Sequence, residues 1–444
     1  EDHIYTKSDL IYRFDGILNK KLQEIDDKGI FADVRNFKLQ KGVVGTIIEQ
    51  CVLGYPPNSR QEADLVVQDG SKIIKMELKS TGMVIDSSGS DHFVAKEPMS
   101  ITAVGIYDLA DQTFYSSFFW HKLEHMLLVY YHYSYDHAVK PYDFRNFYIK
   151  GYDFHEFNKE DELILKRDWE HVHSLIVSII SEKPGPKDKE WKEEVKNEYI
   201  DRHGELRQVL SYIDLAPKYP PRFRLKRSVV SLMIAKHFGY ELEQLPGRYN
   251  EVSDIDIKCQ ELTVKYSGKT VAELSKIFNI SYSNSKNMSE KMIIGMFGGT
   301  STKLNKIELF VRFGLIAKTI VLSHKGGKTE DMKLFHIDFE EMVKTTIIDE
   351  DGSLKPMSFE DSMLYSYFAD HEFLCAIFQE PDKDSIPDTD SNDINNENSL
   401  YRNIFLGFKR LVFSDDFIYN YVFKLWMDTR DKIMNNKLRI VFKH

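Results

Sequence analysis

The sequence predicts a mixed α/β fold divided between two domains. Segments with apolar residues at three- and four-residue intervals alternate with short runs rich in aromatic and β-branched residues, which are typical of strands. The chain has 444 residues, of which 42% are hydrophobic, and single cores rarely extend beyond about 250 to 300 residues. The polar stretch LPGRYNEVSD, near Leu245, is typical of a linker. We therefore expect one domain at residues 1–245 and a second at residues 246–444.

The first domain is expected to begin with helices and continue with strands. An amphipathic helix is predicted at DLIYRFDGILNKKLQEI and a shorter one, bounded by glycines, at GVVGTIIEQCVLG. The stretch EADLVVQDGSKIIKMELKS predicts a hairpin with its turn at Asp69-Gly70. Further strands are predicted at MSITAVGIYDL, TFYSSFFW and HMLLVYYHYS, followed by the long helix KEDELILKRDWEHVHSLIVSII.

The second domain is expected to repeat this order. After the helices TVAELSKIFNI and MSEKMIIGMF, a strand pair KIELFVRFG and LIAKTIVLS parallels the first hairpin. The segment SYFADHEFLCAIF parallels SSFFWHKLEHMLLVYY, and VFKLWMDTRDKI parallels LILKRDWEHVHS. The acidic, Asn-rich stretch EPDKDSIPDTDSNDINNENS is expected to be a mobile loop. The chain is therefore expected to contain one fold twice.

Composition excludes several kinds of protein. No apolar run approaches the roughly 20 residues of a membrane helix, and the first residues lack the pattern of a secretion signal, so we expect a cytoplasmic protein. The three cysteines, Cys51, Cys259 and Cys375, are odd in number and far apart, which indicates neither a disulfide framework nor a zinc site. The net charge of -10 disfavours a passive coat for nucleic acid.

One charged constellation lies on the predicted hairpin. Glu77 and Lys79 are two residues apart and therefore share a face of their strand. With a turn at Asp69-Gly70, Asp64 lies opposite Lys75, and Glu77 becomes its diagonal neighbour at roughly 7 to 8 Å between α-carbons. Two such carboxylates can bind Mg²⁺, which keeps waters and leaves room for a substrate phosphate.

Taken alone, this pattern is more often a solvated hairpin with salt bridges than a site, so its context decides. Glu49 lies in the apolar helix VVGTIIEQCVL, where a buried carboxylate needs a partner or a metal, and Lys122 follows in HKLEH. A later basic segment without acids, APKYPPRFRLKRSVVSLMIAK, suits a polyanion. It contributes the candidate DNA-binding residues Lys218, Arg222, Arg224, Lys226 and Arg227. Together these features predict metal-dependent phosphodiester cleavage.

The runs KGVVGTIIEQ, ADLVVQDG and MELKS, in this order, resemble the MutH mismatch-repair nicking endonuclease and the related Sau-three-A-I type restriction enzymes. The segments KEDELILKRDWEHVHSLI, DRHGELRQVLSYIDLAPK and RFRLKRSVVSLMIAKHFG resemble the same family in the same order. The second half, with SFEDSMLYSYFADHEFLCAIF and VFKLWMDTRDKI, resembles the C-terminal half of the Sau-three-A-I type enzymes.

The resemblance implies a PD-(D/E)xK restriction-endonuclease-like fold in two copies, one catalytic and one degenerate. It implies that Asp64 and Glu77 bind the metal, Mg²⁺, and that Lys79 completes the catalytic set. Glu49 would be the helix acid of the same site and Lys122 an accessory lysine.

The resemblance also bears on the DNA target. Lys218, in APKYPP, matches the base-reading loop of a family that cuts GATC, and a lysine there can donate to guanine acceptors. Arg224 stands where MutH has a tyrosine that helps to sense adenine methylation, so discrimination of that kind is not implied.

Aligned by eye, the second copy has lost the charged residues. Gly295 falls opposite Glu49, Thr319 opposite Glu77 and Val321 opposite Lys79, while Glu308 keeps an acid opposite Asp64. A domain changed in this way is expected to bind DNA and regulate cleavage.

The leading hypothesis is a bacterial type II restriction endonuclease that cuts double-stranded DNA and associates with a second copy on its substrate. Two alternatives remain open: a MutH-like nicking repair endonuclease, and a non-catalytic, sequence-specific DNA-binding protein.

Overall fold

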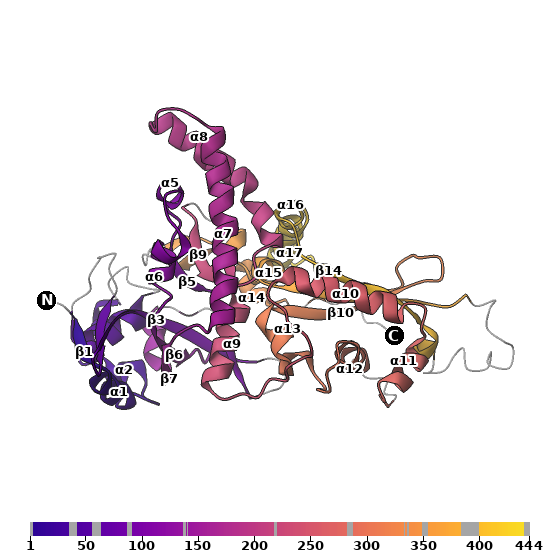
Figure 1. Cartoon of the computed structure of the whole chain (residues 1–444), viewed down its shortest axis with the longest axis horizontal. Helices are drawn as coiled ribbons and strands as arrows, with labels where there is room; N and C mark the ends of the chain where they lie inside the picture. Colours follow the sequence, from indigo (N-terminus) through magenta and orange to yellow (C-terminus); the bar gives the residue numbers. More distant parts are fainter. Residues whose placement is uncertain are drawn as a thin grey trace.

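The computed structural model describes residues 3–34, 42–55, 64–86, 91–135, 139, 141–216, 220–281, 287–332, 334, 337–348, 354–382 and 399–438. A six-stranded mixed sheet lies in the N-terminal half, with strand order β1-β2-β3-β6-β7 and β4 beside β3 (Figure 1). Its strands are β1 (Ile4–Thr6), β2 (Leu65–Asp69), β3 (Lys72–Ile85), β4 (Phe93–Ala95), β6 (Met126–His132) and β7 (Tyr148–His155). Strands β3 and β6 are parallel, and β2 and β7 run antiparallel to their neighbours in this central part.

Strand β6 is the centre of this sheet because both of its faces are covered. Leu127 and Val129 belong to one core, and Met126, Leu128 and Tyr130 belong to the other. The first core lies under the helices α1 (Lys7–Asp15), α2 (Leu22–Ile25), α3 (Ile30–Val34) and α4 (Val43–Ile47) and the π-helix η1 (Ile48–Leu53). An apolar run without alternation, as in MLLVYY, is the expected pattern for such a strand.

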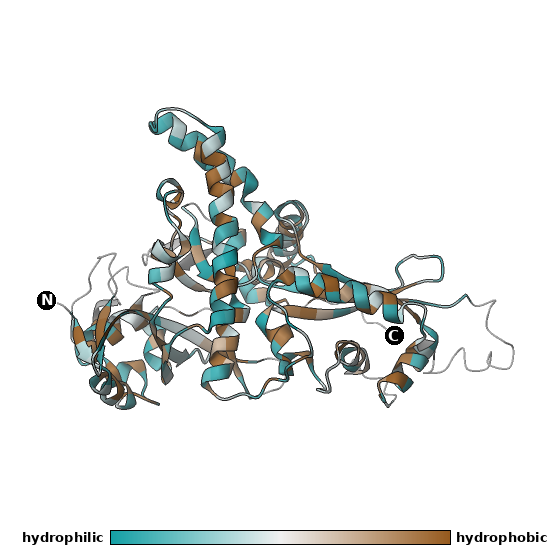
Figure 2. Cartoon of the chain, in the orientation of Figure 1, coloured by the Kyte–Doolittle hydropathy of each residue, from teal (hydrophilic) through white to brown (hydrophobic). Residues whose placement is uncertain are grey.

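The opposite face of the sheet packs on a second group of helices. They include α6 (Phe118–His121), α7 (Lys159–Glu182) and α9 (Arg227–His237). Helix α8 (Lys189–Arg202) follows α7 and extends away from the body of the molecule. Figure 2 shows that α8 is mostly hydrophilic, and only Trp191, Val195 and Tyr199 of this helix are buried. A small second sheet, in the order β5-β9-β8, joins β5 (Met99–Ala103), β9 (Arg222–Leu225) and β8 (Ile213–Leu215), and α5 (Ile106–Leu109) follows β5.

The C-terminal half contains a three-stranded sheet in the order β10-β13-β14, with α10 against β14. Its strands are β10 (Leu315–Leu322), β13 (Glu372–Gln379) and β14 (Ile404–Leu411), and β11 (Thr346–Ile348) pairs antiparallel with β12 (Leu354–Pro356). Its helices are α10 (Val252–Tyr266), α11 (Val271–Ile277), α12 (Asn287–Met296), α13 (Glu308–Arg312), α14 (Phe339–Val343), α15 (Met363–Ala369), α16 (Asp415–Phe417) and α17 (Phe423–Met434), with a π-helix η10 (Ile418–Val422). The largest core runs through both halves, from Met83 and Trp169 to Phe297 and Phe405.

Three strands in each half have the same arrangement. The pair β10–β13 is parallel and β13–β14 antiparallel, as in β3–β6–β7. Each antiparallel pair contains one register shift, between Tyr130 and Tyr131 in the first and between Ile377 and Phe378 in the second. A glycine, Gly151 or Gly407, pairs with the residue before each shift.

The elements around these strands also correspond. Before β6 and before β13, a 3₁₀ turn is followed by a short helix whose N-cap serine, Ser117 or Ser362, is fully buried. Each serine hydroxyl donates to the carbonyl three residues earlier at 2.6 Å and accepts from the backbone N–H three residues later at 3.1 Å. This correspondence covers three strands and their connections.

The register corrects the alignment made by eye. The shared bulge makes Met126 equivalent to Phe373, and these residues pair with Glu77 and Ile316 in the neighbouring strands. Two residues further along, Lys79 corresponds to Lys318. The predictions of Thr319 and Val321 at these places were therefore wrong.

Several predicted elements also differ. KIELFVRFG forms the helix α13 and not a strand. Leu309 and Phe310 lie in this helix and Phe313 directly follows it, and the helical spacing of the three residues places them on one buried face. TFYSSFFW forms a 3₁₀ turn, η2 (Phe114–Ser116), and α6, because Ser117 caps the helix. The first helix ends at Asp15, and MSITAVGIYDL divides into β5 and α5. The hairpin, the short helix with Glu49, β6, α7, α11, α12 and α17 are confirmed.

Candidate active site on strand β3

The β2–β3 hairpin sets the relative position of the predicted acids. Asp69 pairs with Lys72 and Val66 with Lys75, so the turn consists of Gly70 and Ser71, with Gly70 at a φ of 62°. The predicted turn at Asp69-Gly70 was wrong: Gly70 is the first residue of the two-residue turn rather than the second, and its positive φ suits that position.

The corrected register brings the two acids closer together. Continued by one residue beyond the Leu65–Met76 pair, it places Asp64 opposite Glu77 rather than opposite Lys75. Lys75 is exposed and lies outside the site. The two carboxylates therefore start from directly opposed backbone positions.

Glu77 is the centre of the site. Only 3% of its side chain is exposed, and its Oε1 accepts from Lys79 Nζ at 2.9 Å and from Lys122 Nζ at 2.7 Å. Lys79 comes from the same strand, and Lys122 is the C-cap residue of α6. The second oxygen, Oε2, is buried and has no hydrogen-bond partner within the described part of the chain. A buried carboxylate oxygen in this condition is ready to accept an incoming donor or cation.

Asp64 and Glu49 border Glu77. Asp64 Oδ2 accepts from the backbone N–H of Leu78 at 2.9 Å. Burial, followed by the negative charge of Glu77, raises the pKa of Asp64. Glu49 lies in the first turn of the π-helix η1, where burial and the charges of Asp64 and Glu77 raise its pKa to about 7. The three acids therefore repel one another in a partly desolvated site, and a cation would relieve this repulsion.

The residues present fit a magnesium ion. Mg²⁺ is usually bound through one or two protein carboxylates together with waters and substrate phosphate, and Asp64 with the free Oε2 of Glu77 supplies this donor set. Among the described residues no three His, Cys, Asp or Glu side chains form a ready-made metal cage. Glu49 borders the two candidate ligands, Asp64 and Glu77, whose charges act on it.

Sequence reasoning missed two residues beside this site, Tyr55 and His3. Their rings stack with centroids 3.9 Å apart, and His3 Nδ1 donates to the Asp64 carbonyl at 3.1 Å. His3 and Asp64 are 61 positions apart in the sequence, and the pairing of β1 with β2 brings them together. Tyr55 follows directly after Gly54, the turn that ends η1. Its closeness to Glu49 in the sequence was the available signal.

The candidate DNA-binding residues lie apart from the acids, on and after β9. Arg224 pairs with Asp214, and Lys226 Nζ donates to the Leu210 carbonyl at 2.6 Å. Arg227 Nε donates to the Ala95 carbonyl at 2.7 Å, while Arg222 is half-buried. Lys218 lies outside the described residues. These arginines and Lys226 therefore already have protein partners or are half-buried, and their contact with DNA stays a prediction.

The comparison with protein families matches this region of the chain. Residues 53–168 match the model of the DNA mismatch repair enzyme MutH. The matched region contains Asp64, Glu77, Lys79 and Lys122, whereas Glu49 lies just before its first residue. The match implies a nuclease that acts on DNA, and nucleases of this family are typically metal-dependent.

No curated protein matches the chain. In the described part of the chain, no helix is both long and apolar enough to cross a membrane.

Proposed function

We propose that the chain is a type II restriction endonuclease that hydrolyses double-stranded DNA at a short sequence, GATC, with Mg²⁺ as cofactor. The observation that carries this proposal is the state of Glu77, whose carboxylate has one oxygen held by two lysines and the other buried and free opposite Asp64. A decayed nuclease fold would have no need to maintain such a costly arrangement of charges.

The residues of the chain divide the reaction between them. When bound by Asp64 and Glu77, Mg²⁺ supplies Lewis-acid activation of the phosphate and of water. Lys79 and Lys122 hold the Glu77 carboxylate in one orientation and place positive charge where the phosphate gathers negative charge. Lys79 also orients the attacking water. The water oxygen forms a bond to phosphorus and gives up a proton to solvent, the bond from phosphorus to the 3′-oxygen breaks, and the 3′-oxygen takes up a proton from solvent. The products are 5′-phosphate and 3′-hydroxyl ends.

We further propose that the C-terminal half is a degenerate copy of the same fold. The shared strand arrangement, bulge and N-cap serines support this idea. In the equivalent strand, Ile316 replaces Glu77 while Lys318 keeps the place of Lys79. Without the carboxylate, this copy is expected to bind DNA without cutting it.

Contacts between the halves give this copy a way to regulate cleavage. Lys226 Nζ lies 3.4 Å from Glu372 Oε1, and Arg207 Nη2 lies 2.7 Å from Asp415 Oδ1. Burial and the charge of Asp214 raise the pKa of Asp370 to about 6, although Arg224 and Arg227 act in the opposite direction. The acids of one half therefore face the basic segment of the other, so DNA that engages this segment changes the contacts of the C-terminal half.

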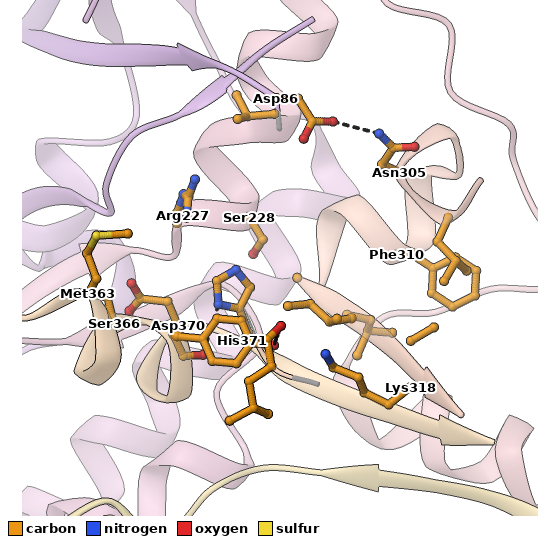
Figure 3. A pocket seen from close by; sticks show the side chains of 18 of the residues that line it. Asp86, Arg227, Ser228, Asn305, Phe310, Lys318, Met363, Ser366, Asp370 and His371 are labelled. Carbon is orange, nitrogen blue, oxygen red and sulfur yellow. Dashed lines mark hydrogen bonds between the residues drawn. The ribbon is translucent and has the colours of Figure 1, made fainter. Parts of the chain in front are cut away.

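A cleft of about 2220 Å³ follows the same boundary. Figure 3 shows Arg227 and Ser228 of α9 facing Asp370, His371 and Lys318 across it. At its upper edge, Asn305 donates to Asp86 at 2.7 Å and so joins the two halves directly. A shift of the C-terminal half would open or close this cleft.

One digestion tests the proposed function. The full chain is incubated with plasmid DNA and Mg²⁺, and the fragment ends are sequenced. Discrete fragments with 5′-phosphate ends at GATC support the proposal. Nicked circles alone would indicate a MutH-like nicking enzyme, and binding without any cleavage would indicate a non-catalytic DNA-binding protein. Since one site cuts one strand, double-strand cleavage also requires two chains on the DNA or two successive nicks.

A further inference from the structure

The hydroxyl group of Tyr55 is buried without a partner. The side chain is 5% exposed, and Oη forms no hydrogen bond within the described residues. A buried hydroxyl without a partner destabilises the folded state, and phenylalanine would fill the same space without this loss. Tyr130 has a buried hydroxyl of the same kind, so it is the position of Tyr55 beside the acids that points to a role.

Tyr55 is linked to both acids that flank Glu77, through its backbone on one side and its ring on the other. Its N–H donates to the Glu49 carbonyl at 3.1 Å, through a turn in which Gly54 has a φ of 89°. On the other side, the stacked His3 ring is inclined by only 10° and hydrogen-bonds to the Asp64 carbonyl. The phenol ring is thus fixed between the segments that carry Glu49 and Asp64.

The electrostatics of the ring are those of a hydrogen-bond donor. Burial and the charges of Glu49, Asp64 and Glu77 all raise the pKa of Tyr55, so its hydroxyl keeps its proton at neutral pH. The three carboxylates are near enough to act on Oη, yet none of them accepts its hydrogen. The Tyr55 hydroxyl is therefore a hydrogen-bond donor without an acceptor, and it lies beside the acids on which the proposed reaction depends.

We propose that Tyr55 is a further active-site residue whose hydroxyl donates a hydrogen bond to a nonbridging oxygen of the scissile phosphate. This inference rests on the proposed nuclease function. A phosphate oxygen brought to Asp64 and Glu77 is an acceptor of the required kind, and the hydrogen bond would stabilise the charge that builds on this oxygen.

The first test compares Tyr55→Phe with a matched control, Tyr130→Phe. Tyr130 also has a buried hydroxyl without a partner in the described part of the chain, but the only charge found to act on it is that of Asp153. We expect Tyr55→Phe to lower the single-turnover cleavage rate about tenfold, the effect of one good hydrogen bond, while its melting temperature stays equal or rises. Tyr130→Phe should keep the wild-type rate. Equal rates for wild type and Tyr55→Phe would overturn the assignment, as would a rate loss that follows a fall in melting temperature.

A second test reads binding rather than cleavage. Each protein is titrated, in Ca²⁺ instead of Mg²⁺, with a GATC duplex that carries either phosphate or one methylphosphonate diastereomer at the scissile position. Removing the acceptor oxygen should weaken binding to wild type and to Tyr130→Phe more than to Tyr55→Phe, since the variant has already lost the donor. The same loss of affinity in all three proteins for both diastereomers would contradict the contact. A wild-type protein that never cleaves DNA would instead refute the proposed function itself.

Discussion

Strand β3 lies beside β6 as β10 lies beside β13, and only β3 carries the proposed catalytic set. In β3, Lys79 pairs with Glu77 at 2.9 Å. In β10, the equivalent lysine, Lys318, lies over the rings of Tyr367 and Phe373, with its Nζ 5.9 and 5.2 Å from their centroids. Ile316 stands in the place of the acid. The comparison teaches that the carboxylate, rather than the lysine, distinguishes the proposed active copy from the proposed silent copy.

The largest expected difference in cleavage rate is between two variants, each with one of these lysines replaced by alanine. Lys79→Ala should lower the cleavage rate by about 10³-fold or more, equivalent to roughly 4 kcal/mol of transition-state stabilisation, because it removes both a charge and the support of Glu77. Lys318→Ala is the matched control and should retain the basal rate. Single-turnover digestion measures both, and similar losses in the two variants would end the distinction between the copies.

The shared core predicts the next effect. Residues 1–245 alone should fail to fold stably, because the core that contains Met83 and Trp169 continues through Phe297 and Phe405 of the C-terminal half. Circular dichroism and thermal melting of the truncated chain measure this. A cooperative transition near that of the full chain would show that the halves are independent domains.

A smaller effect is expected at the boundary between the halves. Asp415→Ala removes the acceptor of Arg207 Nε at 2.9 Å and Nη2 at 2.7 Å, and should lower stability by about 1 to 3 kcal/mol because Arg207 loses its charged partner. Urea unfolding gives the stability change. Lys258→Ala, which removes an exposed pair with Glu261 at 3.1 Å, is the control and should change stability by less than about 1 kcal/mol.

The same variant tests regulation. If the halves communicate through this boundary, Asp415→Ala should alter the response of cleavage to an added duplex that carries a second target site, whereas Lys258→Ala should not. An identical response in both variants and in wild type would remove this contact from the regulatory proposal.

The sequence allowed the hairpin of the proposed active site to be predicted because its signals are local. Alternation in ADLVV and KMELK, the glycine of the turn and the apolar helix around Glu49 each follow from neighbouring residues. The register was missed by two residues because either of two pairs, Asp69-Gly70 or Gly70-Ser71, can form such a turn. Because of that shift, Asp64 lies opposite Glu77 and not opposite Lys75 as predicted.

Features that depend on distant parts of the chain were beyond local patterns. His3 reaches Asp64 only through the pairing of β1 with β2, and Tyr55 is fixed by that ring. Likewise, the partners of Lys226 and Arg207 in the C-terminal half have no local sequence signal. The helix α13 was mistaken for a strand because a short apolar run such as IELFV suits both structures.

The most direct test of the central claim is Glu77→Gln, which keeps the shape of the side chain and removes its charge. Calorimetric titration with Mg²⁺ and single-turnover digestion are carried out on the same preparations of wild type and variant. The account predicts that the variant stays folded, loses the Mg²⁺ binding seen in wild type and does not cleave DNA. A folded variant that binds Mg²⁺ and cuts DNA as wild type does would contradict it.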